Sequence, residues 1–433
     1  MEDKTTVQDA HYLETTNVWA PFTQHQTSDA PIPVVKASGA YLHAADGSRY
    51  LDAISSWWVT LHGHCHPYIA RKIAEQATQL EHVMLAGFTH PPACELAQRL
   101  TALLPANLTR VFYSDNGSTA VETALKIALQ YWHNRNEMRP RTKVVTLKGG
   151  YHGDTVGAMS LSDRSFFTRP FEPILFDVIS IDPPFIGSEE ASLDQLKAAL
   201  ANDDVACFIY EPGLQGVGGM ISHSLEGLDA LIGLCRQHNV LTIADEVLVG
   251  CGRTGPLFVS NAMANAPDMV CLAKGLTGGF LPLAATVCSE HLFEAFLSDE
   301  LKKALLHGHS YAGNPIGCAA ALANLDLLED PLCAQQRQFI EQKHRAFQQK
   351  LLGHPGIKRC EVIGTILIVD YRNDHASSYY NPLRNRLASF FLNRHVLLRP
   401  FGNTVHAIPP YCVDADDLQQ IYDALEASLT EVP

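Results

Sequence analysis

The sequence lacks long apolar runs and any stretch rich in lysine and arginine. No apolar run approaches the ~20 residues that a membrane span requires, and the 433-residue chain carries a net charge of −14. This acidic balance argues against the basic surface that tracks a nucleic-acid backbone. Residues 1–17 contain neither a basic start nor an apolar core, which argues against a secretory signal. We therefore expect a cytoplasmic protein with no membrane and no nucleic-acid partner.

Closely spaced cysteines are also absent. The chain contains 11 cysteines, an odd number, and none of them forms a C-x-x-C pair. Several, including Cys207, Cys271 and Cys288, lie in apolar segments, where cysteine behaves as a small hydrophobic residue. The pattern favours free thiols in a reducing compartment over a disulfide framework.

Three histidines alternate along one short segment, at His62, His64 and His66. Metal sites combine histidines with cysteines or carboxylates at matched spacing, and no acid accompanies this triplet within the segment. We therefore expect no metal ion there.

The middle of the chain alternates short apolar runs with helical patterns. Strands are predicted at 110–113, 143–147, 207–211, 240–244, 269–273 and 282–289, and helices at 67–80, 91–104, 120–132, 227–238 and 316–329. Such alternation is typical of an α/β fold with a mostly parallel central sheet and helices on both faces.

The two ends of the chain differ from this middle region. Residues 1–54 contain a predicted hairpin at 40–52, and we expect them to form the N-terminal part of a smaller domain. We expect residues 55–330 to form a large domain. Residues 331–433, with mixed helical and strand patterns, are predicted to form the C-terminal part of the smaller α+β domain.

Two adjacent tryptophans, Trp57 and Trp58, begin the predicted large domain. On a strand they would face opposite sides, so that one packs in the core and the other faces open space. Packing at a core or subunit interface and lining an apolar substrate pocket both remain open for them.

Two of the predicted strands end in ionisable groups. The strand at 240–244 leads to Asp245 and Glu246, and the strand at 269–273 leads to Lys274 in a glycine-rich turn. Ligands of open α/β sheets lie at the carboxyl ends of the strands, so we expect the acid and the amine in one crevice. Pyridoxal phosphate needs such a pair, because a lysine holds it as a Schiff base and a carboxylate keeps its ring nitrogen protonated. The alternative is an acid that caps a turn and a solvated lysine.

The segment Ser114–Thr119 leads directly into a predicted helix. Backbone N–H groups and the helix dipole at such a terminus bind phosphate well, although Ser118 or Thr119 could also act as a plain N-cap. The segment matches neither the P-loop nor the dinucleotide-binding pattern. Tyr151 lies between glycines that let its ring cover a flat ligand, and Glu211 ends another predicted strand.

Five motifs occur in the order found in a known enzyme family. They are Asn116-Gly117-Ser118, Tyr151-His152-Gly153, Asp245-Glu246-Val247, Lys274-Gly275 and Gly313-Asn314-Pro315. With them the chain resembles, along nearly its whole length, the class III (omega) aminotransferases. The resemblance implies a pyridoxal-phosphate transferase of fold type I.

Within that family, four further features resemble the branch that works in biotin synthesis. They are Trp19-x-Pro21-Phe22-Thr23-Gln24, Ser55-Ser56-Trp57-Trp58, Tyr151-His152-Gly153-Asp154 and Arg399-Pro400-Phe401-Gly402-Asn403. The resemblance implies amino transfer from S-adenosylmethionine to 8-amino-7-oxononanoate, which gives 7,8-diaminononanoate. Lysine as the donor, another omega-aminotransferase or an aminomutase remain alternatives, as does a cofactor-free binding protein on the same scaffold.

The resemblance also implies roles at the cofactor. Lys274 would hold pyridoxal phosphate and move the proton, and Asp245 would pair with the ring nitrogen. A phosphate ligand from the partner subunit would require at least a homodimer. The implied phosphate contacts are Gly117, Ser118 and, from the partner subunit, Ser310 with the adjacent His309; the implied ring contacts are Tyr151, Val247 and Glu211.

For the substrate, the resemblance implies that Arg399 takes the carboxylate of the keto acid. The remaining implied substrate contacts are Phe22, Trp57, Tyr151 and Gly308. Two positions depart from the family pattern. Well-known members carry a tyrosine in place of Phe22, and Gly308-His309-Ser310 stands where the biotin branch often has Pro-Thr after the glycine. Ser310 can still donate a hydrogen bond to phosphate.

Overall fold

A computed structural model describes residues 17–135, 141–373 and 381–432. Its centre is a seven-stranded sheet in the order β4-β12-β11-β10-β7-β5-β6. Pairing is parallel from β6 through β5, β7 and β10 to β11, while β12 runs antiparallel to both β11 and β4, so the predicted mostly parallel sheet is confirmed. The strands are β4 (Leu108–Ser114), β5 (Lys143–Leu147), β6 (Ile179–Ile181), β7 (Val205–Tyr210), β10 (Leu241–Asp245), β11 (Met269–Leu272) and β12 (Ala284–Ser289).

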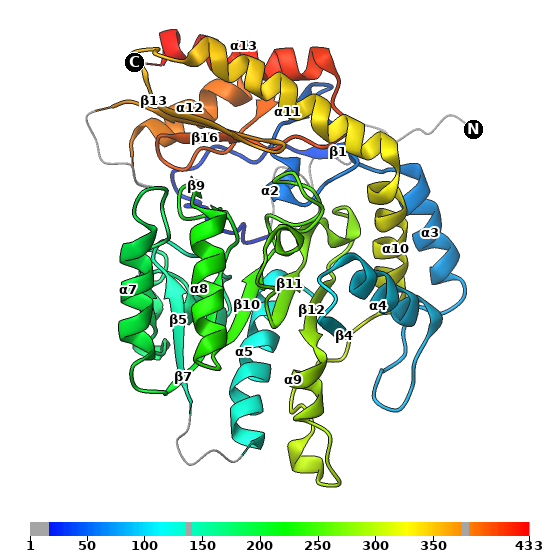
Figure 1. Ribbon diagram of the computed structural model, residues 1–433. Coiled ribbons are helices and arrows are strands. Elements are labelled where there is room, and N and C mark those ends of the chain that lie inside the picture. The colour runs from blue at the N-terminus through cyan, green and yellow to red at the C-terminus, as the bar shows by residue number, and fades with distance from the viewer. Residues whose placement is uncertain (1–16, 136–140, 374–380, 433) are drawn as a thin grey trace.

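Helices cover both faces of this sheet, as predicted (Figure 1). On one face, Ile209 of β7 belongs to the hydrophobic cluster of α5 (Gly117–Asn134). Its neighbour Tyr210 points the other way and joins the cluster of α8 (Leu225–Gln237). Because successive residues of a strand point to opposite faces, burial on both sides requires the continuous apolar runs that the sequence displays.

The two ends of the chain meet in a second, four-stranded sheet. Strands β1 (Val34–Ser38), β2 (Tyr41–Ala44) and β3 (Arg49–Asp52) form an antiparallel meander, which confirms the predicted hairpin. From the far end of the chain, β15 (Val396–Leu397) pairs parallel with β3. This shared sheet supports our proposal that both chain ends build one smaller domain.

A three-stranded antiparallel sheet, in the order β13-β14-β16, lies in the C-terminal region. It lies with α11, α12 and α13 at the top of the molecule in Figure 1, above the large sheet. These elements are α11 (Pro331–Leu351), β13 (Ile357–Ile363), β14 (Ile366–Tyr371), α12 (Leu383–Leu392), β16 (Thr404–Ala407) and α13 (Ala415–Glu431).

Trp57 and Trp58 do not lie on a strand. They belong to a short turn, α2 (Ser55–Trp58), in which all four residues have positive φ, at 49°, 44°, 74° and 72°. A left-handed conformation costs a non-glycine residue roughly 1–2 kcal/mol, so the turn needs support from its surroundings. Asp52 supplies part of it by accepting hydrogen bonds from the amide and the hydroxyl of Ser56, at 2.9 and 2.7 Å.

The remaining elements include α3, α4 and α10, which lie close to predicted helices, and several short elements and α7, which were not predicted. They are α3 (Pro67–Ala77), α4 (Pro91–Leu103), α6 (Val156–Leu161), η2 (Arg169–Ile174), α7 (Glu189–Leu200), β8 (Leu214–Gln215), β9 (Ile221–Ser222), η3 (Val259–Ala262), η4 (Lys274–Thr277), α9 (Glu290–Glu294), η5 (Leu301–Lys303) and α10 (Pro315–Glu329). Within the described ranges, no helix has both the length and the apolar character needed to cross a membrane.

Candidate active site

The predicted functional side chains gather where the strands of the large sheet end. Asp245 ends β10, Lys274 follows β11, Glu211 follows β7 and Tyr151 lies beyond β5. Two cavities, of about 1200 and about 500 Å³, meet there, and Lys274 and Tyr151 line both. The acid and the amine therefore face one crevice at the carboxyl edge of the sheet.

The N-terminus of α5 forms one wall of the smaller cavity. Asn116 caps the helix by accepting from the Thr119 amide, and the Asn116 amide donates to Thr119 Oγ1, both at 3.1 Å. The amides of Gly117 and Ser118 lie in the first turn, where a helix has no internal acceptors, and both residues line the cavity. A Cβ at Gly117 would lie 2.8 Å from Val247 Cγ1, so only glycine fits. This wall offers backbone donors and a helix dipole to an anion such as a phosphate group.

Asp245 and His152 form a buried pair in the same cavity. Asp245 Oδ2 lies 2.8 Å from His152 Nδ1, and Asp245 Oδ1 accepts from the Val247 amide at 3.1 Å. Because an ionised carboxylate only accepts, His152 Nδ1 carries the hydrogen. The adjacent acid, Glu246, turns away and binds the amides of residues 259 and 260 at 2.7 Å each. Of the two adjacent acids, Asp245 is the one that lines the cavity.

Lys274 lies at the junction of the two cavities. Its Nζ is 4.9 Å from the centroid of the Trp58 ring. Burial lowers the pKa of Lys274 below its usual value, and the carboxylates of Asp245 and Glu211 oppose part of this shift. A lysine with a lowered pKa keeps more of its amine neutral near physiological pH, which a nucleophile or a base requires.

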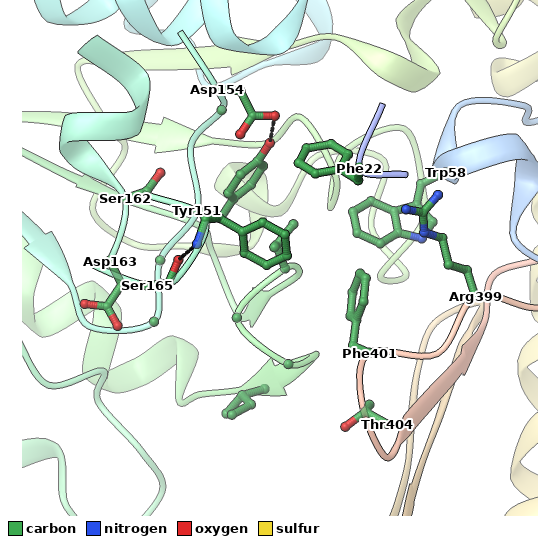
Figure 2. Close-up of a pocket in the computed structure, with 18 of the residues that line it drawn as sticks. Phe22, Trp58, Tyr151, Asp154, Ser162, Asp163, Ser165, Arg399, Phe401 and Thr404 are labelled. Carbon is green, nitrogen blue, oxygen red and sulfur yellow. Dashed lines mark hydrogen bonds between the residues drawn. The ribbon is translucent and has the colours of Figure 1, made fainter. Parts of the chain in front are cut away.

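Glu211 holds the loop that carries Tyr151. Its two carboxylate oxygens accept from the amides of Tyr151 and Gly216, at 3.1 and 3.0 Å. Burial raises the pKa of Glu211 to about 7, although the neighbouring His152 acts in the opposite direction. The hydroxyl of Tyr151 donates to Asp154 Oδ2 at 2.9 Å (Figure 2), and burial raises the pKa of this phenol well above its usual value. The ring therefore stays neutral at its place in the cavity wall.

Arg399 and several aromatic rings line the larger cavity (Figure 2). The guanidinium carbon of Arg399 lies 4.1 Å from the centroid of the Trp57 ring. Phe22 packs edge-on against Trp57 and against Phe167, with ring centroids 5.8 Å apart in both contacts. An apolar channel with a cation on its wall suits a ligand that has an apolar chain and a terminal carboxylate.

Three predicted contacts do not reach these cavities within one chain. Gly308, His309 and Ser310 line neither cavity. Just before them, His307 stacks on Phe112 of β4, with ring centroids 5.6 Å apart, and its Nδ1 lies 3.2 Å from the Nζ of Lys126 on α5. Because the predicted roles of His309 and Ser310 belong to a partner subunit, they stay predictions.

The histidine triplet has partners other than a metal. His64 Nε2 lies 2.8 Å from Asp52, and His62 Nε2 lies 3.1 Å from Asn324 Oδ1. Asp52 is thus an acid beside the triplet in space, although it lies ten residues before His62 in the sequence. Across the described ranges, no group of three or more histidines, cysteines or acids could hold a metal ion.

Two residues of the site, His152 and Asp154, had no predicted role. His152 holds Asp245, and Asp154 accepts from the Tyr151 hydroxyl. Both stand in the motif Tyr151-His152-Gly153-Asp154, so the signal was present in the sequence. Their partners could not be predicted, because the His152–Asp245 contact joins positions 93 residues apart.

Comparison with known proteins gives a consistent result. The family model of class-III aminotransferases matches residues 22–429. The chain is 45% identical to the adenosylmethionine-8-amino-7-oxononanoate aminotransferase of Synechococcus elongatus, over 96% of this chain and 99% of that protein. Among solved structures, the adenosylmethionine-8-amino-7-oxononanoate aminotransferase of Methanocaldococcus jannaschii has a TM-score of 0.91 at 33% identity, with 98% of each chain covered. A PLP-bound amine transaminase from an uncultivated Pseudomonas species has a TM-score of 0.90 at 29% identity, with 97% and 100% covered. The chain therefore belongs to the class-III aminotransferase family.

Proposed function

We propose that this protein is a pyridoxal-phosphate enzyme that transfers an amino group from S-adenosylmethionine to 8-amino-7-oxononanoate, giving 7,8-diaminononanoate for biotin synthesis. The observation that carries the proposal is the junction of the two cavities at Lys274, with a phosphate cradle on one side and Arg399 in an aromatic channel on the other. The relatives named for this reaction support the choice of substrates.

The residues of the smaller cavity fit pyridoxal phosphate. The first-turn amides of Gly117 and Ser118 suit its phosphate, and the lack of a side chain at Gly117 lets the start of α5 pack against Val247. Asp245, oriented by His152, is the carboxylate that would bond the ring nitrogen. When bound, the cofactor supplies an electron sink, which makes the hydrogen on the carbon that bears the substrate's amino group acidic.

Lys274 would serve twice. Its Nζ amine would first hold the cofactor and, once a substrate amine has displaced it, would act as a general base and acid for the proton. Burial favours the neutral amine that both roles need, because it lowers the pKa of Lys274. Tyr151 would cover the ring, while Glu211 fixes the backbone of the loop that presents Tyr151.

Arg399 would bind the carboxylate of the keto acid, and the rings of Trp57 and Phe22 would enclose its apolar chain. A guanidinium lying over an aromatic ring is held in place before the ligand arrives, which lowers the entropic cost of binding. Phe22 lacks the hydroxyl that a tyrosine would place in this channel. A substrate in this channel is therefore bound without that group.

The proposal extends to a homodimer, in which Gly308, His309 and Ser310 complete the cofactor site of the partner subunit. In support, these residues line neither cavity of their own chain.

All 11 cysteines are unpaired, which supports a reducing compartment such as the cytoplasm.

The experiment that tests the proposal follows the cofactor's absorbance after one substrate is added at a time. Purified protein loaded with pyridoxal phosphate should lose its yellow band on mixing with S-adenosylmethionine and regain it on adding 8-amino-7-oxononanoate. Lys274→Ala should lack the yellow band of the wild-type protein. Lysine and alanine serve as alternative donors, and a loaded protein that responds to either of them but not to S-adenosylmethionine contradicts the donor assignment.

A further inference from the structure

The backbone that carries Lys274 is strained. Lys274 has a φ of 44°, in the left-handed region that favours glycine. It begins the single turn η4, which ends at Thr277 and is followed by Gly278 with a φ of 65°. A side chain on such a backbone keeps its direction only where the surrounding structure holds the turn in place.

One fully buried side chain on α10 holds this turn. Asn324 is 0% exposed, and its Nδ2 donates to the carbonyl oxygens of Gly275 and Leu276, at 2.9 and 3.1 Å. Both amide hydrogens are thereby used on the two residues that directly follow Lys274. This also fixes the side-chain orientation of Asn324, so that Oδ1 points away from the turn.

His62, from the N-terminal part of the chain, contacts the remaining polar atom of the Asn324 side chain. Its Nε2 lies 3.1 Å from Asn324 Oδ1. Because Oδ1 can only accept, Nε2 must carry the hydrogen and donate it. Burial lowers the pKa of His62 to about 4, so the ring is neutral near physiological pH and adds no charge. His62 also packs edge-on against Tyr411, with ring centroids 6.1 Å apart.

The segment that carries His62 also contacts the residues that follow the turn, Gly278 and Gly279. A Cβ at Gly279 would lie 2.8 Å from Thr60 Cα, and the Leu61 amide donates to the Gly278 carbonyl at 3.4 Å. Neither His62 nor Asn324 lines either cavity. Any effect of these two residues on the chemistry therefore passes through the backbone after Lys274.

We propose that Asn324 and His62 are positioning residues, which hold the strained turn so that the Lys274 amine faces the aldehyde of the cofactor. The inference rests on the proposed function only in that Lys274 condenses with this aldehyde and releases water. Two of the three alternating histidines thereby have structural roles. His62 anchors the lysine turn, while His64, through Asp52, supports the turn of Trp57.

The test measures how fast cofactor-free protein captures pyridoxal phosphate, by absorbance at equal protein and cofactor concentrations. Asn324→Ala removes both donors to the turn, and Leu328→Ala, also buried on α10, is the matched control that loosens the core without removing a hydrogen bond to the turn. Losing these bonds should slow capture about tenfold or more. Leu328→Ala should lower the melting temperature but leave the capture rate within about twofold of wild type.

Two variants of His62 test the same proposal if Asn324→Ala does not fold. His62→Leu removes the donor to Asn324, whereas His62→Gln can restore it, so only the leucine variant should slow capture. A second readout is the pH dependence with which acetic anhydride labels Lys274 in the cofactor-free protein, measured by mass spectrometry. The apparent pKa from this labelling should shift in His62→Leu and return in His62→Gln.

The proposal is overturned if Asn324→Ala or His62→Leu captures the cofactor at the wild-type rate with unchanged labelling. It is also overturned if glutamine and leucine at position 62 behave alike. A wild-type protein that captures the cofactor but leaves 8-amino-7-oxononanoate unchanged would instead refute the proposed function. That result would leave the roles of Asn324 and His62 standing.

Discussion

At the scale of single residues, burial shifts the two central ionisable groups in opposite directions. It lowers the pKa of Lys274 and raises that of Glu211 to about 7. Both shifts favour the neutral form, because burial disfavours the charged form of each group. Asp245 contacts His152 Nδ1 at 2.8 Å and accepts a hydrogen bond from the Val247 amide at 3.1 Å.

The pKa of Glu211 has a consequence for stability. A glutamate in the unfolded chain has a pKa near 4.5, so a folded-state pKa of about 7 means that the folded chain holds this proton more tightly than the unfolded chain. The resulting penalty is absent below pH 4.5, grows as the pH rises to about 7, and is then constant, on the order of 3 kcal/mol. Glu211→Gln cannot ionise and should remove this pH-dependent fall in the free energy of unfolding, at a constant cost because its NH2 group cannot accept one of the two amide hydrogen bonds.

Urea unfolding of the cofactor-free protein between pH 5 and 8 checks this prediction, and the quantity compared is the difference between variant and wild type. A difference that stays constant over this range would mean that Glu211 is ionised in the folded chain throughout.

Arg399 is expected to serve one substrate only. Arg399→Ala removes the guanidinium from the aromatic channel, and losing a charge-assisted bond worth about 1.5–3 kcal/mol should raise the KM for the keto acid roughly 10- to 100-fold. The rate of the donor half-reaction should change little. Arg399→Lys keeps the positive charge but cannot form two parallel hydrogen bonds with a carboxylate. Its KM for the keto acid should therefore lie between those of the wild-type protein and Arg399→Ala. Equal losses in both half-reactions would contradict this role.

At the scale of secondary-structure elements, the sequence predicted those strands and helices whose signal lies within a short stretch of the chain. The apolar runs that end at Asp245 and Lys274 are strands β10 and β11, because burial on both faces leaves a continuous pattern. The turn at Trp57 and Trp58 could not be predicted in this way. It contains no glycine, and its left-handed conformation depends on Asp52 and on Ile408, whose carbonyl accepts from the Ser55 hydroxyl at 2.7 Å.

The first turn of α5 should link helix stability to cofactor binding. Asn116→Ala breaks the capping box and should lower the free energy of unfolding by about 1 kcal/mol, and it should also weaken binding of pyridoxal phosphate. Asp414→Ala is the matched control, since it breaks the capping box of α13 far along the chain. Both variants should lose similar stability in thermal unfolding. Only Asn116→Ala should raise the cofactor's Kd, and an equal rise in both would contradict a role for the α5 terminus.

At the scale of the whole molecule, the proposed site extends beyond one chain. Gly308, His309 and Ser310 line neither cavity of their own subunit, so the cradle at α5 lacks their contribution within a monomer. Sequence reasoning could predict this loop from its resemblance to the family. It could not place the loop against a partner, because spacing along the chain carries no information on contacts between chains.

Mixed dimers test the shared site. When Lys274→Ala and Ser310→Ala chains are combined, a shared arrangement gives one site with both residues intact and one with neither. Titration of the mixed dimers with pyridoxal phosphate should then show the wild-type Kd at half of the sites. If each site belongs to one chain, every site lacks one of the two residues, and no wild-type Kd appears.

In the proposed reaction, this protein moves an amino group onto the keto acid at Lys274. The most direct measurement supplies S-adenosylmethionine with heavy nitrogen in its amino group, together with 8-amino-7-oxononanoate, and follows the products by mass spectrometry. We expect 7,8-diaminononanoate with one heavy nitrogen from the wild-type protein, and none from the Lys274→Ala protein. Recovery of the keto acid unchanged, while the loaded protein passes amino groups to other carbonyl compounds, would contradict it.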